Sequence, residues 1–448
     1  MQEADLIVVG GGAAGMTAAT TASEEGLSVI LLEKSASLGG NTLAAANGVN
    51  AADSAVQLAD EQYQAAGAGI EGLEELQLQN EQARENLVDA FAENSAEVIN
   101  WISDMGVEFT VSIQEDDRNP LQNYYMLRVD ASGSTGITMT KAVENAMSQT
   151  DVTVYKNMDA TTLIQSEDGA VNGVIAVNAD GEEITFTGKA VLIATGGFGY
   201  NQELLGEVNE KLGKAVTDEI APNTGEGLLM AQAVGAKAVD LGEIQTFPVV
   251  MEGYGMVTPN KLPGGFGVNA VVVNQEAERF TAEGFEIGDA ILTQTDGAAY
   301  MIFREDQISE DMQNIIDAGY VASAETAAEL GEALGLDGAA LQSTVDAYNE
   351  DVADGTDDAF GKEGALPLEG KLYGFKYGVG AHYFMGGILI NEQTQVLDES
   401  EAPIAGLYAA GEVTGGFHGT QRIDGSGIGD SFTFGRIAGH EIAAALAE

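Results

Sequence analysis

Three cationic side chains in this sequence stand where they could do chemistry: Arg279 in NQEAERFTAEG, His382 in GAHYFMGG and Arg422 in GTQRIDGSG. The chain has 3 histidines, and its 18 lysines and arginines face 71 acidic residues, so a cation beside glycine or aromatic residues is a candidate for function. A guanidinium can hold a carboxylate through two parallel hydrogen bonds, and an imidazole changes charge near neutral pH. A surface ion pair for Arg422 and a core histidine for His382 are the simpler alternatives.

The composition excludes other chemistries and partners. The 448-residue chain has no cysteine, which excludes disulfides, thiolate catalysis, iron–sulfur clusters and cysteine-bound zinc. Its net charge of −53 repels nucleic acid and anionic membranes, and a solvated surface explains that charge better than a specific basic partner does. No apolar run reaches the roughly 18 residues that span a bilayer. We therefore expect no nucleic-acid partner and no membrane insertion.

The N-terminus bears on localisation. No signal peptide precedes the first apolar run, so the chain as written is expected in the cytoplasm. An extracytoplasmic location stays open if this N-terminus is a trimmed one.

The first element that could position such residues is LIVVGGGAAGMTAA, residues 6–19. It predicts a buried parallel strand, a glycine turn at Gly10, Gly12 and Gly15, and a helix whose first N–H groups face a phosphate. The next apolar run, LSVILLEK, ends in Glu33, which is placed to bind ribose hydroxyls. A bare strand–helix turn is the alternative in a chain with 58 glycines, but the two features together predict dinucleotide binding.

Later segments return to the same kind of site. Residues 35–52 form a small-residue loop that allows close backbone approach to a cofactor, and residues 57–105 are expected to be mainly helical. Several strands then lead to AVLIATGG, a buried strand that ends in a second glycine turn. This second turn indicates a chain that returns to one cofactor.

Six segments, in their order and spacing, resemble the fumarate reductase, flavocytochrome c and succinate dehydrogenase flavoprotein family: VVGGGAAGMTAA, LLEKSASLGGNT, VLIATGGF, TGEGLLMAQAVGA, AHYFMGGILI and GLYAAGEVTGGFHGTQRIDGSGIGDSFTFGRIAG. The similarity covers nearly the whole chain. It implies non-covalently bound FAD and an α/β fold, with a Rossmann-like FAD-binding domain and an inserted α+β capping domain. The FAD-binding domain would comprise residues 1–241 and 384–448, and the capping domain residues 242–383.

The resemblance also implies which residues bind the cofactor, mainly in the glycine turns. They are Gly10, Gly12, Ala13, Ala14, Gly15, Glu33, Lys34, Gly39, Gly40, Asn41, Thr42, Gly48, Thr195, Gly196, Gly197, Glu226, Gly411, Glu412, Ser426, Gly427 and Ile428. Glu412 matches the acid that holds the ribityl chain. The helix beginning near Gly425 is expected to stabilise the reduced flavin through its N-terminus.

The same resemblance assigns roles to the three cations. Arg422 matches the arginine that binds a substrate carboxylate, and His382 matches the histidine that shares it. Tyr383, beside His382, is common in the succinate dehydrogenase branch. His418 is expected to support the residues that contact the substrate without contacting the substrate itself. Arg279 matches the arginine of the family's G-x-R-F motif, which acts as the acid that protonates the substrate carbon.

The chain departs from the family where that arginine would be reprotonated. A guanidinium is a poor acid because its pKa exceeds about 12, so Arg279 needs a relay. The T-E-x-x-R-G relay segment reads VTPNKLPGG here, with Pro259 and Leu262 where the family has Glu and Arg. The remaining candidates for the relay are Thr258, Lys261 and Glu283.

A second departure concerns substrate choice. Phe247, in IQTFPVV, replaces the family histidine that binds the other end of a dicarboxylate. Burying an unpaired carboxylate costs several kcal/mol, whereas an apolar or aryl group would pack against Phe247. The sequence therefore predicts an FAD-dependent reductase of 2-enoates, such as acrylates, cinnamates or urocanate, with hydride from flavin N5 going to the β-carbon.

Three other functions remain open: a fumarate reductase proper, a flavin dehydrogenase or reductase of ketosteroid-like enones, and a non-catalytic FAD electron carrier. The lost relay and the aromatic residues favour the second, and Arg422 speaks against it. The sequence has no haem-attachment motif and no second nucleotide fingerprint. We therefore expect electrons from a separate flavin or haem domain or subunit, and a small unsaturated carboxylate as substrate.

Overall fold

The computed structural model describes residues 2–45, 47–112, 125–129, 134–251, 253–258, 261–265, 270–284, 287–354, 356–357, 359–363 and 365–447. The chain forms two compact units, which are described separately below. Unit 1 comprises Met1–Asn201, Ile220–Gln245 and Tyr383–Glu448, and unit 2 comprises Gln202–Glu219 and Thr246–His382.

A six-stranded sheet forms the centre of unit 1. Its order is β23 (Gln395–Leu397), β24 (Pro403–Ala409), β11 (Ala190–Ile193), β2 (Leu6–Val9), β3 (Val29–Glu33) and β7 (Thr153–Lys156). All neighbouring pairs are parallel except β23 with β24. Every residue of β2, β3 and β11 is buried, as expected for parallel strands covered on both faces. The predicted Rossmann-like arrangement is therefore present.

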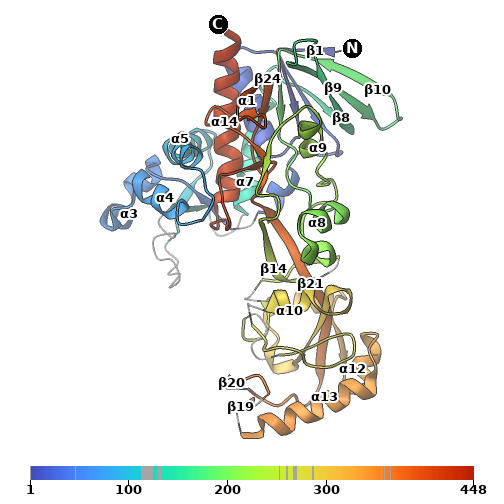
Figure 1. Ribbon diagram of the computed structural model, residues 1–448. Coiled ribbons are helices and arrows are strands. Elements are labelled where there is room, and N and C mark those ends of the chain that lie inside the picture. Colours follow the sequence, from blue (N-terminus) through green and yellow to red (C-terminus); the bar gives the residue numbers. More distant parts are fainter. Residues whose placement is uncertain are drawn as a thin grey trace. The chain divides into compact units, whose positions relative to one another are not determined.

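Two helices far apart in the chain pack closely against each other in unit 1. Helix α1 (Ala13–Glu24) lies beside α14 (Ser426–Ala447), the long red helix of Figure 1. A Cβ on Gly435 would lie 2.6 Å from the carbonyl oxygen of Ala14, and one on Gly439 would lie 2.5 Å from Cβ of Thr21. Glycine at these two positions therefore sets the close approach of the first and last helices.

Smaller elements complete unit 1. A second sheet has the order β1 (Gln2–Glu3), β10 (Glu183–Thr187), β9 (Val171–Asn178) and β8 (Met158–Gln165). Two three-stranded sheets contain β4 (Val49–Asn50), β6 (Met126–Val129) and β5 (Phe109–Val111), and β13 (Ala238–Val239), β22 (Gly387–Leu389) and β25 (Thr414–Gly415). The other helices are α2 (Ala55–Ala59), α3 (Glu61–Ala66), α4 (Ile70–Gln77), α5 (Glu85–Asp104), α7 (Thr135–Met147) and α9 (Glu226–Ala233).

Unit 2 is an α+β unit built on a sheet with the order β15 (Gly255–Met256), β14 (Ile244–Met251), β21 (Leu372–Phe384), β17 (Ala298–Arg304) and β16 (Val271–Val273). Strands β12 (Val216–Thr217) and β18 (Ala322–Ala324) also pair with β21. One core cluster packs the sheet residues Val271, Tyr300 and Ile302 against α12 (Ala327–Ala333) and α13 (Gly338–Asp351). The remaining elements are α8 (Gln202–Val208), α10 (Gly288–Leu292), α11 (Glu310–Asp317), β19 (Thr356–Asp357) and β20 (Lys362–Glu363).

The division into units differs from the expected domain boundaries chiefly in one segment, and residues 242–245 and 383, expected in the capping domain, also fall in unit 1. Residues 202–219 were placed with the FAD-binding domain, but they group with unit 2. The reason is the parallel pairing of β12 with β21, which joins Val216 to Gly380 and Thr217 to Ala381. A two-residue strand gives no periodic signal from which this pairing could be predicted. Within the described part of the chain, no helix is long and apolar enough to cross a bilayer.

Candidate functional site

The turn between β2 and α1 has the backbone that its glycines predict. Gly10 has a φ of +110°, and a Cβ there would lie 2.2 Å from the carbonyl oxygen of Ala194. A Cβ on Gly15 would lie 1.9 Å from the carbonyl oxygen of Gly10, so this glycine serves helix–strand packing. A Cβ on Gly12 would meet nothing within 4 Å, and Gly12 caps α1 without a side-chain hydrogen bond. The helix start is therefore open to an anion.

Glu33 closes this turn from the end of β3. Its Oε2 accepts a hydrogen bond from the Gly11 N–H at 2.8 Å, and its Oε1 accepts one from the Ser35 N–H at 2.7 Å. Each carboxylate oxygen keeps a further lone pair, so these bonds orient the group without excluding the predicted ribose hydroxyls.

A cleft with about 800 Å³ of empty space runs along these elements, entirely within unit 1. Of the predicted cofactor residues, the cleft is lined by Gly10, Gly12, Ala13, Ala14, Glu33, Lys34, Gly40, Asn41, Thr42, Thr195, Gly196, Glu226, Gly411 and Glu412. Those outside its lining are Gly15, Gly39, Gly48, Gly197, Ser426, Gly427 and Ile428. Gly48 has a packing role instead, because a Cβ there would lie 2.5 Å from the Met126 side chain.

Two polar features of the cleft fit FAD. The Oγ1 atom of Thr195 is buried and has no hydrogen-bond partner among the described residues. Lys34 Nζ lies 2.7 Å from Glu226 Oε1 and 2.9 Å from Thr224 Oγ1. Burial opposes the charge of Glu226, but hydrogen bonds from Lys34 and Thr224 outweigh this effect and lower the pKa of Glu226.

Asp159 also lines the cleft and was not identified from the sequence. Burial raises the pKa of its carboxyl.

The start of α14 is tied to two other parts of unit 1. Ser426 Oγ accepts hydrogen bonds from Asn50 Nδ2 at 3.0 Å and from Gln77 Nε2. Asn50 Oδ1 and Gln77 Oε1 are buried without a partner among the described residues. Gly427 serves packing, because a Cβ there would lie 2.6 Å from the Tyr383 ring.

The guanidinium of Arg422 contacts an aromatic ring on one face and a side-chain amide along one edge, both within unit 1. Its guanidinium carbon lies 4.8 Å from the centroid of the Tyr383 ring, and its Nε donates to Gln245 Oε1 at 2.8 Å. The carboxylate beside it, Asp424, is 56% exposed and lies 3.5 Å from Nη2. Nη1 makes no hydrogen bond within the described part of the chain. The arginine is thus oriented by neutral groups and keeps donors for a further carboxylate.

Tyr383 is itself anchored by buried groups. Its hydroxyl donates to Asp430 Oδ2 at 3.2 Å and lies 3.1 Å from His418 Nε2. Burial, reinforced by the charge of Asp430, raises the pKa of Tyr383 well above its ordinary value. Burial lowers the pKa of His418, so the imidazole is neutral at pH 7. The Tyr383 ring is therefore held in place beside Arg422, with His418 next to its hydroxyl.

His382 lies in unit 2 with a carboxylate partner. Its Nδ1 is 2.7 Å from Asp218 Oδ2, and its ring centroid is 6.1 Å from that of Phe247. The His382 side chain is 29% exposed and that of Asp218 is 9% exposed. The structure thus brings Phe247 and His382 together and adds Asp218 as a partner of His382.

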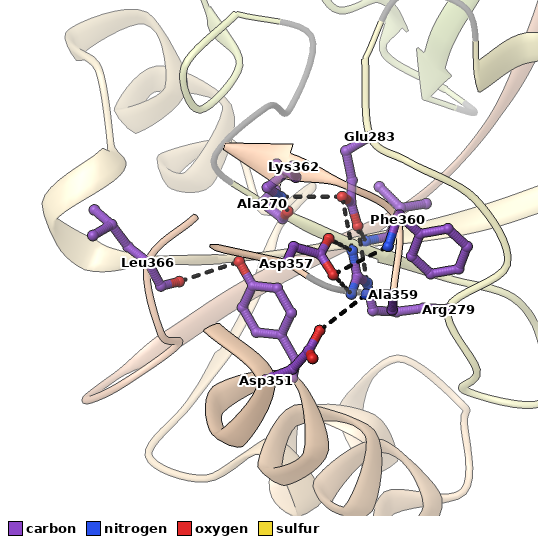
Figure 2. Close-up of polar contacts among 11 residues, drawn as sticks. Ala270, Arg279, Glu283, Asp351, Asp357, Ala359, Phe360, Lys362 and Leu366 are labelled. Atoms are coloured by element: carbon purple, nitrogen blue, oxygen red, sulfur yellow. Dashed lines mark hydrogen bonds and ion pairs between the residues drawn. The ribbon is translucent and has the colours of Figure 1, made fainter. Parts of the chain in front are cut away.

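Arg279 lies in a different part of unit 2, inside a cluster of charges (Figure 2). Its Nη2 lies 2.6 Å from Asp357 Oδ2 and 3.2 Å from Glu283 Oε2, and its Nη1 and Nε bind the other oxygens of the same carboxylates. Lys362 Nζ also contacts Glu283, at 3.0 Å. The rings of Tyr348 and Phe360 lie 4.9 and 4.7 Å from the guanidinium carbon, which leaves the side chain 8% exposed.

This environment holds the Arg279 guanidinium in its charged form. Burial opposes the charged form, but hydrogen bonds to Asp357 and the charge of Glu283 outweigh it and raise the pKa of Arg279. A proton lost from this guanidinium would leave two buried carboxylates short of a partner, which is costly.

The residues considered for the relay are scattered. Glu283 does contact Arg279, but Lys261 Nζ binds the Tyr254 hydroxyl at 3.2 Å, and Thr258 accepts a backbone bond from Lys261. Leu262 is a buried core residue, and Pro259 lies outside the described residues.

Sequence reasoning missed Asp218, Gln245 and Asp357, which contact the three cations, and Asp430, which accepts a hydrogen bond from Tyr383. Gln245 is 177 positions from Arg422, and Asp218 is 164 positions from His382. No local motif marks any of the four, because each acts through pairing that only the folded chain creates.

The fold and the cleft define a dinucleotide-binding α/β protein, and comparison with known proteins narrows this class. A model of the FAD-binding domain family matches residues 5–428. The chain is 34% identical to urocanate reductase of Eggerthella lenta, over 99% of this chain and 75% of that protein. It is 33% identical to NADH:fumarate oxidoreductase of Klebsiella pneumoniae, over 98% of this chain and 47% of that protein.

A solved structure is similar to the whole of this chain. The open conformation of a flavocytochrome c3 fumarate reductase superimposes with a TM-score of 0.88 at 29% identity, over 100% of this chain and 79% of the other. The chain belongs to the flavoprotein family of fumarate reductases and succinate dehydrogenases, as its motifs predicted. It is an FAD-dependent oxidoreductase of the expected fold class. It spans about half the length of the Klebsiella relative.

Proposed function

We propose that this protein reduces the C=C bond of a 2-enoate that carries one carboxylate and an apolar or aryl substituent. The observation that carries the proposal is the Phe247 ring beside His382, at a centroid distance of 6.1 Å. An aromatic wall offers neither charge nor a hydrogen bond to a second carboxylate, and it favours an aryl group by about 1 kcal/mol beyond buried area.

In this proposal the chain's own side chains bind and orient the substrate. Arg422 binds its carboxylate through guanidinium donors, which Gln245 and the Tyr383 ring hold in place. Phe247 packs against its apolar end. Bound FAD, held by the cleft along Gly12 and Glu33, would supply two electrons as a hydride. A separate flavin or haem domain or subunit supplies the electrons.

The test is a substrate panel with chemically reduced viologen dye as electron donor. We expect cinnamate and urocanate to exceed fumarate in kcat/KM by about 10- to 200-fold, the range of a mismatched pocket contact. Phe247→His should move the ratio toward fumarate, whereas the matched control Phe247→Leu, which keeps an apolar wall, should not.

Each other result would point to another function. Fumarate reduced as well as cinnamate would indicate a fumarate reductase and remove the argument from Phe247. Turnover of a 3-ketosteroid alone would overturn the role of Arg422. No turnover of any substrate, with FAD bound and reducible, would indicate an electron carrier.

A further inference from the structure

We infer that the carboxylate of Asp159 accepts a hydrogen bond from the exocyclic amine of the adenine ring of FAD and thereby recognises this base. Asp159 lies on β8 and lines the same cleft of unit 1 as Gly12 and Glu33. The inference concerns cofactor binding within unit 1, so it does not depend on which substrate the protein reduces.

The backbone places Asp159 directly beyond the residue expected to bind the ribose. Strands β3 and β7 are parallel, with Glu33 opposite Lys156, and the Asn157 N–H donates to the Ser35 carbonyl at 3.1 Å. The chain then enters β8, so Asp159 lies beside the segment that follows Glu33. In a dinucleotide-binding fold, the acid at the end of this strand binds the ribose that carries adenine. The base is therefore the next group along the cleft.

The Asp159 carboxylate is desolvated without being paired. Burial raises its pKa, the charge of Lys34 opposes this effect only in part, and no hydrogen bond within the described residues contributes. Lys34 is itself engaged, because its Nζ lies 2.7 Å from Glu226 Oε1 and 2.9 Å from Thr224 Oγ1. A partly buried carboxylate that lacks a donor is costly. Asp159 is thus suited to a donor that arrives with the cofactor.

The chemistry of FAD leaves one donor for this position. The phosphates only accept hydrogen bonds, and the glycine turn offers them its N–H groups. The ribose hydroxyls are assigned to Glu33, whose two oxygens each keep a lone pair beyond the bonds from Gly11 and Ser35. The ribityl hydroxyls and the flavin N3–H belong to the half of FAD on the far side of the phosphates. Adenine itself carries one donor group, the amine on C6.

The arrangement predicts effects of opposite sign on the empty and the loaded protein. In the apoprotein the unpaired Asp159 carboxylate is a desolvated charge, so Asp159→Ala should leave Tm unchanged or raise it. In the loaded protein the same change removes a hydrogen bond to the base, so FAD should bind more weakly. A residue that only stabilised the fold would lower Tm of the apoprotein as well.

The test is a thermodynamic cycle with two ligands. Apoprotein of the full chain is titrated with FAD and with the FAD analogue whose base is purine, which lacks the amine, and binding is read from flavin fluorescence. We expect the wild type to bind FAD about 10- to 150-fold more tightly than the analogue, the range of a hydrogen bond to a charged group. Asp159→Ala should bind both ligands with one Kd, close to that of the wild type for the analogue. Asp159→Asn, which keeps an acceptor oxygen without the charge, should fall in between.

The matched control is Asp180→Ala, which removes an exposed carboxylate from the turn between β9 and β10, outside the cleft lining. It should keep the wild-type Kd for both ligands. Equal weakening of both ligands in Asp159→Ala would place the contact on another part of FAD, and unchanged Kd values would remove the contact altogether. A lowered Tm of the Asp159→Ala apoprotein would make Asp159 a residue of the fold. Each of these three results would overturn the inference.

Discussion

Arg279 in unit 2 and Arg422 in unit 1 are almost equally buried, at 8% and 10% side-chain exposure, and both lie against aromatic rings. Their partners are opposite in kind. Arg279 is bound to two buried carboxylates, Glu283 and Asp357, whereas Arg422 contacts a neutral amide, a tyrosine ring and one exposed carboxylate, Asp424, at 3.5 Å. Burial alone does not tell a structural arginine from a binding one. The two arginines differ in whether buried carboxylates of the protein already neutralise the guanidinium charge.

Removing Arg422, which we propose binds the substrate carboxylate, should have the largest effect. We expect Arg422→Gln to lower kcat/KM for an enoate by about 30- to 4,000-fold, equivalent to the ~2–5 kcal/mol of a truncated buried charge pair. Arg422→Lys should fall in between, because it keeps the charge and loses the two-pronged geometry. Steady-state kinetics at equal FAD content gives the answer. A loss no larger than that of a surface variant would show that another group binds the carboxylate.

Removing Arg279, which pairs with two buried carboxylates, should lower stability. Arg279→Gln leaves Glu283 and Asp357 facing each other with less positive charge, which costs about 3–5 kcal/mol. Hydrogen exchange should therefore speed up in β16 and β19, while FAD stays bound in unit 1. If exchange is unchanged and turnover disappears, Arg279 is the proton donor after all and the comparison fails.

A pH change should give the smallest effect, because a carboxyl can become neutral by taking up a proton. The hydrogen bond from Arg279 lowers the pKa of Asp357 below its ordinary value of 3.8, with its charge adding to the effect against burial. This stabilisation is full above the unfolded value and is lost as pH falls through the lower folded value. Urea unfolding of wild type and Asp357→Asn should therefore differ at pH 6 and converge toward pH 3. A difference that is constant with pH would exclude the ion pair as its cause.

The sequence predicted what is encoded locally. Gly10, Gly12 and Glu33 act within about one βαβ unit, so their spacing indicated dinucleotide binding, whereas FAD was implied by the resemblance of the six segments to the family. The role of Arg279 could not be settled in this way, because Asp357 lies 78 positions further along the chain. Phe247 and His382 were singled out from the sequence, but their proximity and the partner Asp218 depend on pairing between short strands, which the sequence does not indicate.

The cleft of unit 1 has a consequence for how the protein matures. Its lining begins at Val9 and ends at Ser431, and the first helix is packed against the last. During synthesis on the ribosome, the glycine turn is made first and the residues that complete the cleft are made last. FAD therefore cannot meet its full binding site until Ser431 has emerged, so cofactor capture is a late step that follows translation of nearly all of this sequence.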